Sequence, residues 1–491
     1  MLPAEPSPKA NPVPRDAATA LQRALDAVAA VGLPQNSTSQ WSIPLADAVD
    51  LVAALESCHG RNAPIRILEV GTFVGVGSLL MLQCFPNASL HSVDPNLPLQ
   101  TEFEAMRCRH MDGDLRLRTQ QYAAMAAERL GVRDRLHLHA GGFATPATFA
   151  GGRDAIPVIG PSVVAEHGPF DAIFIDGLHH EQAVLADLRL ALDARRPGNG
   201  IILLHDLVGS WGSNVRRAVY RILEDRDELA LVHPRYSELY RSIGRLAAES
   251  AVVPSRGDRM AALVGESIDA LSNAVADAIE SAIGDAAAQP ADAASERIAA
   301  ILGHRSTGGT PVVVAINSLD DLPPAEARSR LSAWAASADV MVLGLTPPGE
   351  QGVAGPWSRP LARRVRDLAA VGFDAFDRII PFLEPFTYSM GSATMVDLPG
   401  TLLSTSVIAI RRDSKTHRRI LADGARPLNE DSARCLDDLR TQLAHHRAFI
   451  RRERHDREQT AGLLADAQRA LAESTGWRIR IGRHGFLRTN A

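Results

Sequence analysis

Five short apolar runs, separated by helical stretches, constrain the fold of this chain more than any other feature. They span residues 65–70, 90–93, 136–139, 172–175 and 201–204, and a sixth candidate covers 229–232. Strands that alternate with helices are typical of βαβ units, which build parallel sheets with helices on both faces. The sequence therefore predicts an α/β fold with a doubly wound parallel sheet.

The length of 491 residues is too great for one ordinary hydrophobic core, so we expect several domains. The proline-rich residues 1–15 read as a disordered leader. A first domain over 16–250 begins with helices up to about residue 57, where apolar residues recur at helical spacing. The alanine-rich stretch 251–310 predicts one or two helices plus a linker.

A second, smaller α/β domain is expected over 311–415. Its candidate strands are 312–316, 340–345 and 403–410. No glycine-rich turn follows the first of them, so we expect a degenerate domain that serves substrate, partner or oligomer contacts.

The C-terminal part is highly charged. Residues 428–475 predict a helix with an apolar stripe through Leu436, Leu439 and Leu443, which is either a short coiled coil that joins copies of the chain or a solvated helix packed on its own domain. The basic tail 476–491 either touches an anionic surface or is a frayed terminus.

Composition excludes several classes of partner. The net charge is -5 and the pI about 6.4, so neither nucleic acid nor an anionic membrane is suggested. No apolar run reaches the roughly 18 residues of a transmembrane helix, and the N-terminus lacks the apolar region of a signal peptide. The scattered cysteines predict neither a disulfide framework nor a zinc site, which fits a cytoplasmic location. They are Cys58, Cys84, Cys108 and Cys435.

A glycine-rich turn follows the first predicted strand, in the sequence Glu69-Val-Gly71-Thr-Phe-Val-Gly75-Val-Gly77. Glycine permits tight turns and close approach of the backbone to a ligand. A helix opens near Ser78, and its N-terminus supplies free N–H donors. Nucleotides bind at such turns at the carboxyl edge of parallel sheets. The alternative is a glycine-rich connection that binds nothing.

Asp94 ends the next predicted strand. An acidic side chain there can accept hydrogen bonds from both ribose hydroxyls of a cofactor. The alternative is a simple turn residue.

Two further acids close later strands. Asp176 follows the run at 172–175, with His179 in the loop after it, and Asp206 follows the run at 201–204. Neighbouring strands lie about 4.8 Å apart, so the two carboxylates could share one Mg²⁺ that lowers the pKa of a substrate hydroxyl. His179 is then the candidate general base, and His205 a candidate third ligand. Alternatively, Asp206 only caps a helix and His179 is a loop histidine without chemistry.

Together these residues carry a resemblance. Residues 60–245 resemble the class I S-adenosylmethionine-dependent methyltransferases, which have a Rossmann-like sheet. More narrowly, they resemble the family of macrolide sugar O-methyltransferases, which includes proteins named cephalosporin hydroxylase or rhamnosyl O-methyltransferase. The run FDAIFIDGLHHEQAVLADLRLALDARRPGNGIILLHD carries most of this resemblance. The second domain weakly resembles the later half of another methyltransferase-like domain.

The resemblance implies a role for each motif. The glycine turn would hold the methionine part of the cofactor, Asp94 the ribose, and the residues after the third strand the adenine. The implied cofactor-binding residues are Glu69, Gly71, Thr72, Gly75, Gly77, Asp94, Gly142 and Phe143. The implied metal ligands are Asp176, His205 and Asp206, with His179 as the base.

Three departures from the family pattern limit what it implies. In the sugar methyltransferases an acid stands where His205 stands here, which weakens the metal assignment more than the cofactor assignment. Asn199 replaces a glycine in a turn. The last strand of the family sheet is poorly matched by residues 242–247.

The sequence therefore predicts an O-methyltransferase that acts on a hydroxyl of a sugar, glycan precursor or related small molecule, and it does not name the acceptor. The alternative from another class is a non-catalytic, cofactor-binding scaffold in a glycan-assembly complex. An oxygenase is disfavoured, because no two-histidine, one-carboxylate iron site on a β scaffold is evident.

Overall fold

A computed structural model describes most of the two α/β domains. The described residues are 16–33, 42–100, 117–145, 156–207, 212–232, 244–248, 286–290, 310–316, 319–320, 322–345, 348, 357–376, 406–438, 478–482 and 485–489. The expected leader, residues 1–15, and most of the stretches 251–310 and 439–475 lie outside them.

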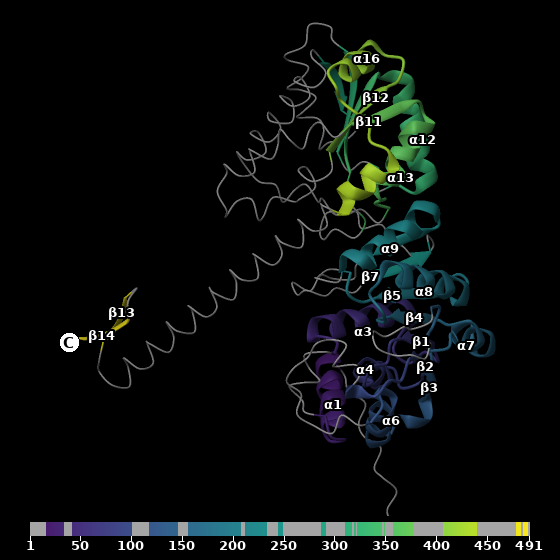
Figure 1. The fold of residues 1–491 in the computed structure, drawn as a ribbon, viewed down its shortest axis with the longest axis vertical. Coiled ribbons are helices and arrows are strands. Elements are labelled where there is room, and N and C mark those ends of the chain that lie inside the picture. The colour runs from purple at the N-terminus through teal and green to yellow at the C-terminus, as the bar shows by residue number, and fades with distance from the viewer. Residues whose placement is uncertain are drawn as a thin grey trace, which may run out of the picture.

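The first domain is a helix-covered sheet (Figure 1). Its strands are β1 Arg66–Val70, β2 Ser89–Asp94, β3 Leu136–Ala140, β4 Ala172–Ile175, β5 Ile201–Leu204, β6 Leu229–Val232 and β7 Gly244–Ala248. Its helices are α1 Ala17–Ala29, α3 Leu45–His59, α4 Val76–Cys84, α6 Thr119–Leu130, α7 Gly160–His167, α8 Glu181–Ala194 and α9 Gly212–Asp225, with a 3₁₀ turn at Arg133–Arg135.

The sheet has the strand order β3-β2-β1-β4-β5-β7-β6. Strands β1 to β5 are parallel, which confirms the predicted Rossmann-like core, whereas β7 runs antiparallel to β5 and β6. Residues of β1 to β5 alternate between two apolar cores, one with α1, α3, α4 and α6 and the other with α7, α8 and α9. Because strand order reverses between β1 and β4, a ligand crevice is expected at the carboxyl ends of these two strands.

The second domain is also α/β, with a mixed sheet in the order β11-β12-β10-β9-β8. Its elements are β8 Ala286–Pro290, β9 Thr310–Ile316, α12 Pro324–Ser337, β10 Val340–Gly344, α13 Leu361–Ala370, β11 Phe373–Phe376, β12 Ser406–Arg411 and α16 Lys415–Ala422. Strands β8, β9 and β10 are parallel, and β12 runs antiparallel to both β10 and β11.

Two expectations for the later part of the chain are corrected. The alanine-rich residues Ala286–Pro290 form a strand where helices and a linker were expected, because they pair in parallel with β9. The basic tail contains an antiparallel hairpin, β13 Arg478–Gly482 and β14 Gly485–Thr489, where a frayed end was the alternative. Of the expected charged helix, residues 430–438 are described and are helical. The rest of the predicted coiled coil, from residue 439 on, falls outside the described part of the chain.

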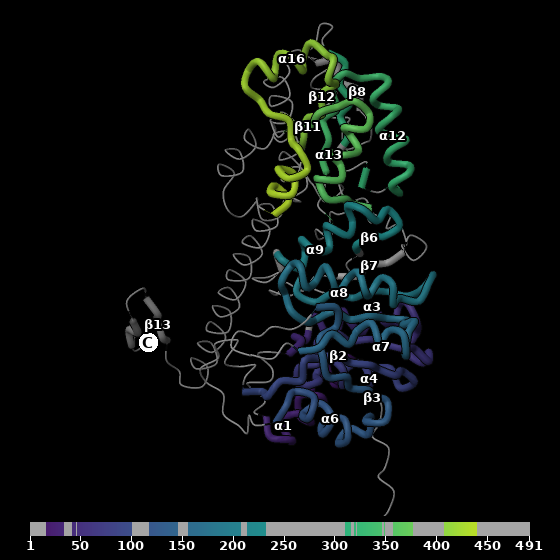
Figure 2. Tube along the Cα trace, turned by 45° about the vertical axis from the view of Figure 1, so that its right-hand side comes forward, coloured from purple at the N-terminus to yellow at the C-terminus, as the bar shows by residue number. Residues whose placement is uncertain are grey.

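The second domain packs on the end of α9 (Figures 1 and 2). Arg363 donates to the carbonyl oxygen of Glu224 at 2.8 Å, and Arg359 to that of Leu229 at 2.8 Å. The side chain of Glu224, only 4% exposed, pairs with Arg434 at 2.7 Å. Arginines of the second domain thus meet the negative end of a helix dipole in the first.

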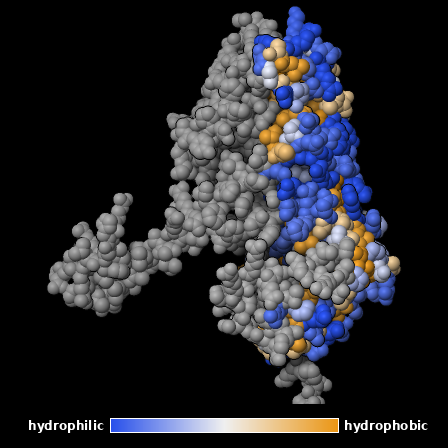
Figure 3. Space-filling model, in the orientation of Figure 1, coloured by the Kyte–Doolittle hydropathy of each residue, from blue (hydrophilic) through white to orange (hydrophobic). Residues whose placement is uncertain are grey.

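The surface shown in Figure 3 is mostly hydrophilic, with apolar residues in small, separate groups. Within the described part of the chain, no helix combines the length and apolar composition of a membrane span. Among the described residues, Cys58, Cys84 and Cys435 form no disulfide.

Candidate active site

The glycine turn lies at the carboxyl end of β1, and two of its glycines are required by close packing. Gly71 has φ +97°, and a Cβ there would lie 2.2 Å from the carbonyl oxygen of Asp176. Gly75 has φ +88°, and its Cβ would meet Ala123 of α6 at 2.6 Å. Only glycine avoids both the strain and the contact at these positions. The turn therefore lies directly against the start of the loop after β4.

Buried hydroxyl groups connect the glycine turn to the Glu69 carboxyl group through hydrogen bonds. The hydroxyls of Ser78 and Ser92 donate to the carboxyl group of Glu69, and Ser92 in turn lies 2.5 Å from the hydroxyl of Thr72. Glu69 is 1% exposed, and this burial raises its pKa to about 8, although both serine hydrogen bonds oppose the rise. A Cβ at Gly77 would come within 3.0 Å of a Glu69 carboxyl oxygen, so glycine keeps the space before that oxygen open.

Asp94 holds the turn by its carboxylate. Its Oδ2 accepts from the backbone N–H groups of Thr72 and Phe73, at 3.1 and 3.0 Å. Its Oδ1 accepts from the N–H of Asn96 at 2.7 Å and from the hydroxyl of Thr119 at 2.9 Å. These four bonds occupy the lone pairs of a carboxylate. The structure thus gives Asp94 a role in shaping the turn, and ribose binding stays a prediction.

Gly142 and Phe143 follow β3, as expected for an adenine-binding loop. The N–H of Gly142 donates to the carbonyl oxygen of Pro157, and its own carbonyl accepts from Ile159, both at 2.9 Å. Phe143 is 4% exposed and packs against Gly160 at the start of α7. The ring of Phe143 therefore belongs to the core beneath this loop, and adenine binding there stays a prediction.

A cluster of acids and histidines occupies the carboxyl ends of β4 and β5. One ligand atom each from Asp176, His179 and Asp206 lie within 4.8 Å of one another. The Nε2 of His179 is 3.0 Å from Asp206 Oδ2 and 3.7 Å from Asp176 Oδ1. Asp206 has φ +56°, a left-handed conformation that is uncommon outside glycine and recurs at functional sites.

His205 lies behind this cluster. Its Nδ1 is 3.1 Å from Asp176 Oδ1, its Nε2 is 3.0 Å from Asp47 Oδ2 of α3, and its side chain is 1% exposed. Both ring nitrogens thus face carboxylates, and His179 takes the place that we expected His205 to fill among the ligand atoms. Asp47 was not predicted as a site residue. The sequence offers one indication of it, a charged residue among the apolar residues of a predicted helix.

The carboxylates and imidazoles of this cluster shift one another's pKa values. Burial lowers the pKa of His179, but Asp176 and Asp206 more than offset this and raise the pKa to about 9. His205, also buried, has its pKa raised well above the usual value, mainly by Asp176. Burial disfavours the charged carboxylates, yet the two imidazoles hold the pKa of Asp176 and of Asp206 below the usual range. The two carboxylates thus favour the protonated form of both histidines of this cluster.

Residues 68–207, which include every one of these groups except Asp47, match a protein-family model described as a methyltransferase domain. This part of the chain is an S-adenosylmethionine-dependent methyltransferase domain. The match covers the glycine turn, Asp94 and both strand-end acids, and it stops before the second domain. No curated protein matches the chain.

Several solved structures show a limited likeness. The O-methyltransferase TomG from Streptomyces achromogenes, solved with S-adenosylmethionine, is 18% identical, with a TM-score of 0.31 over 48% of this chain and 91% of its own. An O-methyltransferase from Bacillus cereus is 18% identical, with a TM-score of 0.30 over 48% and 92%. The mycinamycin-pathway methyltransferase MycE is 12% identical, with a TM-score of 0.25 over 42% and 50%. Likenesses at this level decide nothing about the substrate.

Proposed function

We propose that the first domain transfers the methyl group of S-adenosylmethionine to a hydroxyl of a sugar, glycan precursor or related small molecule. One observation carries this proposal: the glycine turn lies in backbone contact with Asp176, so the cofactor turn and the acid cluster adjoin at one edge of the sheet. Bound S-adenosylmethionine supplies an electrophilic methyl group. The domain would align an acceptor oxygen with it and so reduce the entropic barrier.

The residues around the turn fit that cofactor. Glu69 is a buried carboxyl group whose hydrogen-bond partners in the structure are neutral hydroxyls. An ammonium group such as that of the methionine part would favour its charged form. Gly71, Gly75 and Gly77 would bring the backbone close to the cofactor, while Thr72 and Asp94 hold the turn in shape.

The donor set of Asp176, His179 and Asp206 fits a divalent cation. Two carboxylates and an imidazole are ordinary ligands for such ions, although Mg²⁺ prefers oxygen to nitrogen. A bound cation would lower the pKa of an acceptor hydroxyl. In this proposal His205 orients Asp176 and is not a ligand. Without a cation, Asp176 and Asp206 favour the protonated form of His179. A bound cation would displace that proton, and His179 would then be a ligand and not the base.

Methyl transfer from labelled S-adenosylmethionine to a panel of sugars and envelope-glycan fractions tests the proposal, with calorimetry to measure cofactor binding. Asp206→Asn should keep cofactor binding and lose transfer at least about 100-fold, as expected for a group that acts at the reacting atoms. Glu69→Gln should weaken binding itself. Transfer that is unchanged by chelator and by Asp176→Ala would remove the cation from the proposal.

Wild-type protein that fails to bind the cofactor would overturn the proposal as a whole. Binding without transfer to any acceptor would instead support the non-catalytic scaffold that the sequence left open.

A further inference from the structure

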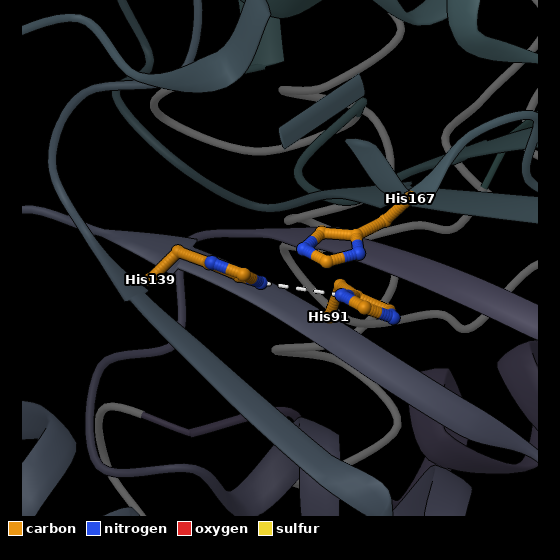
Figure 4. Close-up of side chains that lie close together, drawn as sticks. All are labelled: His91, His139 and His167. Carbon is orange, nitrogen blue, oxygen red and sulfur yellow. Dashed lines mark hydrogen bonds between the residues drawn. The ribbon is translucent and has the colours of Figure 1, made fainter. Parts of the chain in front are cut away.

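A second group of potential metal ligands lies away from the acid cluster, on the face of the sheet that α7 covers. It consists of His91 on β2, His139 on β3 and His167 at the end of α7 (Figure 4). One ring nitrogen of each lies within 4.8 Å of the others. His91 is in register with Leu68, next to Glu69 on β1, so the histidines and the Glu69 carboxyl group occupy opposite faces.

The spacing of these rings suits a shared ion. His91 Nδ1 and His139 Nε2 are 3.2 Å apart, and two nitrogens bound to one tetrahedral Zn²⁺ at about 2.0–2.1 Å lie about 3.3 Å apart. The His167 ring centroid is 4.3 Å from that of His91 and 5.3 Å from that of His139. One ring nitrogen from each of three elements therefore lies close enough to the others to share an ion.

The ligand set favours a metal that prefers nitrogen. Arg66 contributes positive charge near His91, which opposes any cation, while the Glu166 carboxylate lies 3.6 Å from His167 and partly offsets it. The three ligands themselves include no carboxylate. Hard ions such as Mg²⁺ and Ca²⁺ need several oxygens, whereas Zn²⁺, Cu²⁺ and Ni²⁺ accept imidazoles.

The backbone holds the site in place, and one side is open. Arg66 donates to the carbonyl oxygen of His167 at 2.6 Å, which ties the end of α7 to the start of β1. Gln120 donates to the carbonyl oxygen of His139 at 2.9 Å. The side chain of His167 is 27% exposed, so an ion can enter and keep a water molecule at a fourth position.

We propose that His91, His139 and His167 form a binding site for a transition-metal dication of the zinc type, which connects α7 to the edge strand β3 and its neighbour β2. The site lies next to the end of β3, directly before the loop that begins at Gly141. It is separate from any ion at Asp176 and Asp206. Its ion would stiffen the edge of the sheet.

Calorimetric titration of the metal-free, full-length protein with Zn²⁺ tests the proposal. Wild type should bind one equivalent that survives Asp206→Asn. His139→Gln and His167→Gln should each weaken this binding more than about 100-fold, since loss of outer-shell partners alone costs 10–100-fold. His137→Gln is the matched control, because His137 stacks on His91 at 4.5 Å but is outside the ligand group. It should change the affinity less than about threefold.

Thermal unfolding supplies a second measurement. Zn²⁺ should raise the Tm of wild type and of His137→Gln, but not that of His167→Gln. Metal-free variants with the far-UV spectrum of wild type establish that each is folded. The histidine variants are compared in the Asp206→Asn background, so that Zn²⁺ bound at the acid cluster does not mask the result. Zn²⁺ binding that is absent in Asp206→Asn, or that persists there after both His139→Gln and His167→Gln, would overturn the proposal and leave the histidines as a hydrogen-bonded stack.

Discussion

Glu69 shows how a single buried carboxyl group links stability to pH. Its pKa is near 8 in the folded protein and near 4.5 when exposed, so between these values the folded state binds more protons than the unfolded state. Stability must then fall as pH rises through this window. In its charged form, which cofactor binding would need, the Glu69 carboxyl group lowers the stability of the fold. Such a loss of stability in exchange for function is common at binding sites.

Glu69→Gln should remove this pH dependence, because the amide keeps the shape but does not ionise. From pH 5 to pH 8, wild type should lose about 3 kcal/mol of unfolding free energy relative to the variant. Urea denaturation of both proteins across that range measures the difference. Curves that stay parallel from pH 5 to pH 8 would show that Glu69 is not perturbed.

Asp47 is a residue whose role comes entirely from tertiary structure. It lies at 3.0 Å from His205, which in turn lies 3.1 Å from Asp176. Asp47→Asn should leave cofactor binding intact and lower methyl transfer about 10- to 100-fold, because an outer partner orients the group that acts. Asp50→Asn, at another buried acid of α3, is the control and should transfer at the wild-type rate. Equal losses in both variants would mean that the effect is a general destabilisation.

At the scale of elements, the loop that follows β1 is the most constrained part of the site. Gly71→Ala combines a left-handed φ with a contact to the Asp176 backbone, so we expect loss of cofactor binding and a destabilisation of at least about 3 kcal/mol.

Gly131→Ala is the matched control for that change. Gly131 also has a positive φ, +69°, but a Cβ there has open space around it. It should cost only about 1 kcal/mol and leave cofactor binding unchanged. Calorimetry and denaturation of the two variants separate backbone strain from contact. A Gly71→Ala protein that binds cofactor normally would contradict the close packing.

Strands β1, β2, β4 and β5 were predictable because each is a short run that is buried on both faces, whereas β3 lies at the sheet edge and alternates leucine with histidine. Parallel strands place their carboxyl ends at one edge of the sheet. The sequence therefore predicted that Asp176 and Asp206 lie close together, as they do in the structure. Prediction from the sequence failed where pairing overrides composition, as in the alanine-rich β8 and the antiparallel β7.

The site residues that sequence analysis missed depend on contacts across long separations. His205 meets Asp47 across 158 positions, and His91 meets His139 across 48. No local pattern encodes such pairs. For Asp94 the sequence predicted the position at the end of β2 but not the four hydrogen bonds that its carboxylate accepts within the protein.

For the whole molecule, the joint between the domains consists largely of ion pairs at the end of α9. Arg434 forms several of these ion pairs, and its pair with Glu224 is the most buried of them. The side chain of Glu224 is 4% exposed and that of Arg434 25%. A double-mutant cycle with Glu224→Ala and Arg434→Ala should give a coupling of about 1–3 kcal/mol. The same cycle on Arg226 and Glu228, which are 49% and 54% exposed, should give under about 1 kcal/mol. Equal couplings would mean that the joint is no stronger than a surface pair.

The arginines that cap α9 have a consequence for how this protein could be divided or recombined. A fragment that ends near residue 250 would retain the whole matched region, 68–207, yet lose Arg359, Arg363 and Arg434. The carbonyl groups at the end of α9 and the nearly buried Glu224 would then have to be hydrated anew. We therefore expect a fragment cut at the boundary of sequence similarity to be less stable than the same domain in the full chain, and exchange of the second domain for an unrelated one would have to preserve these arginines.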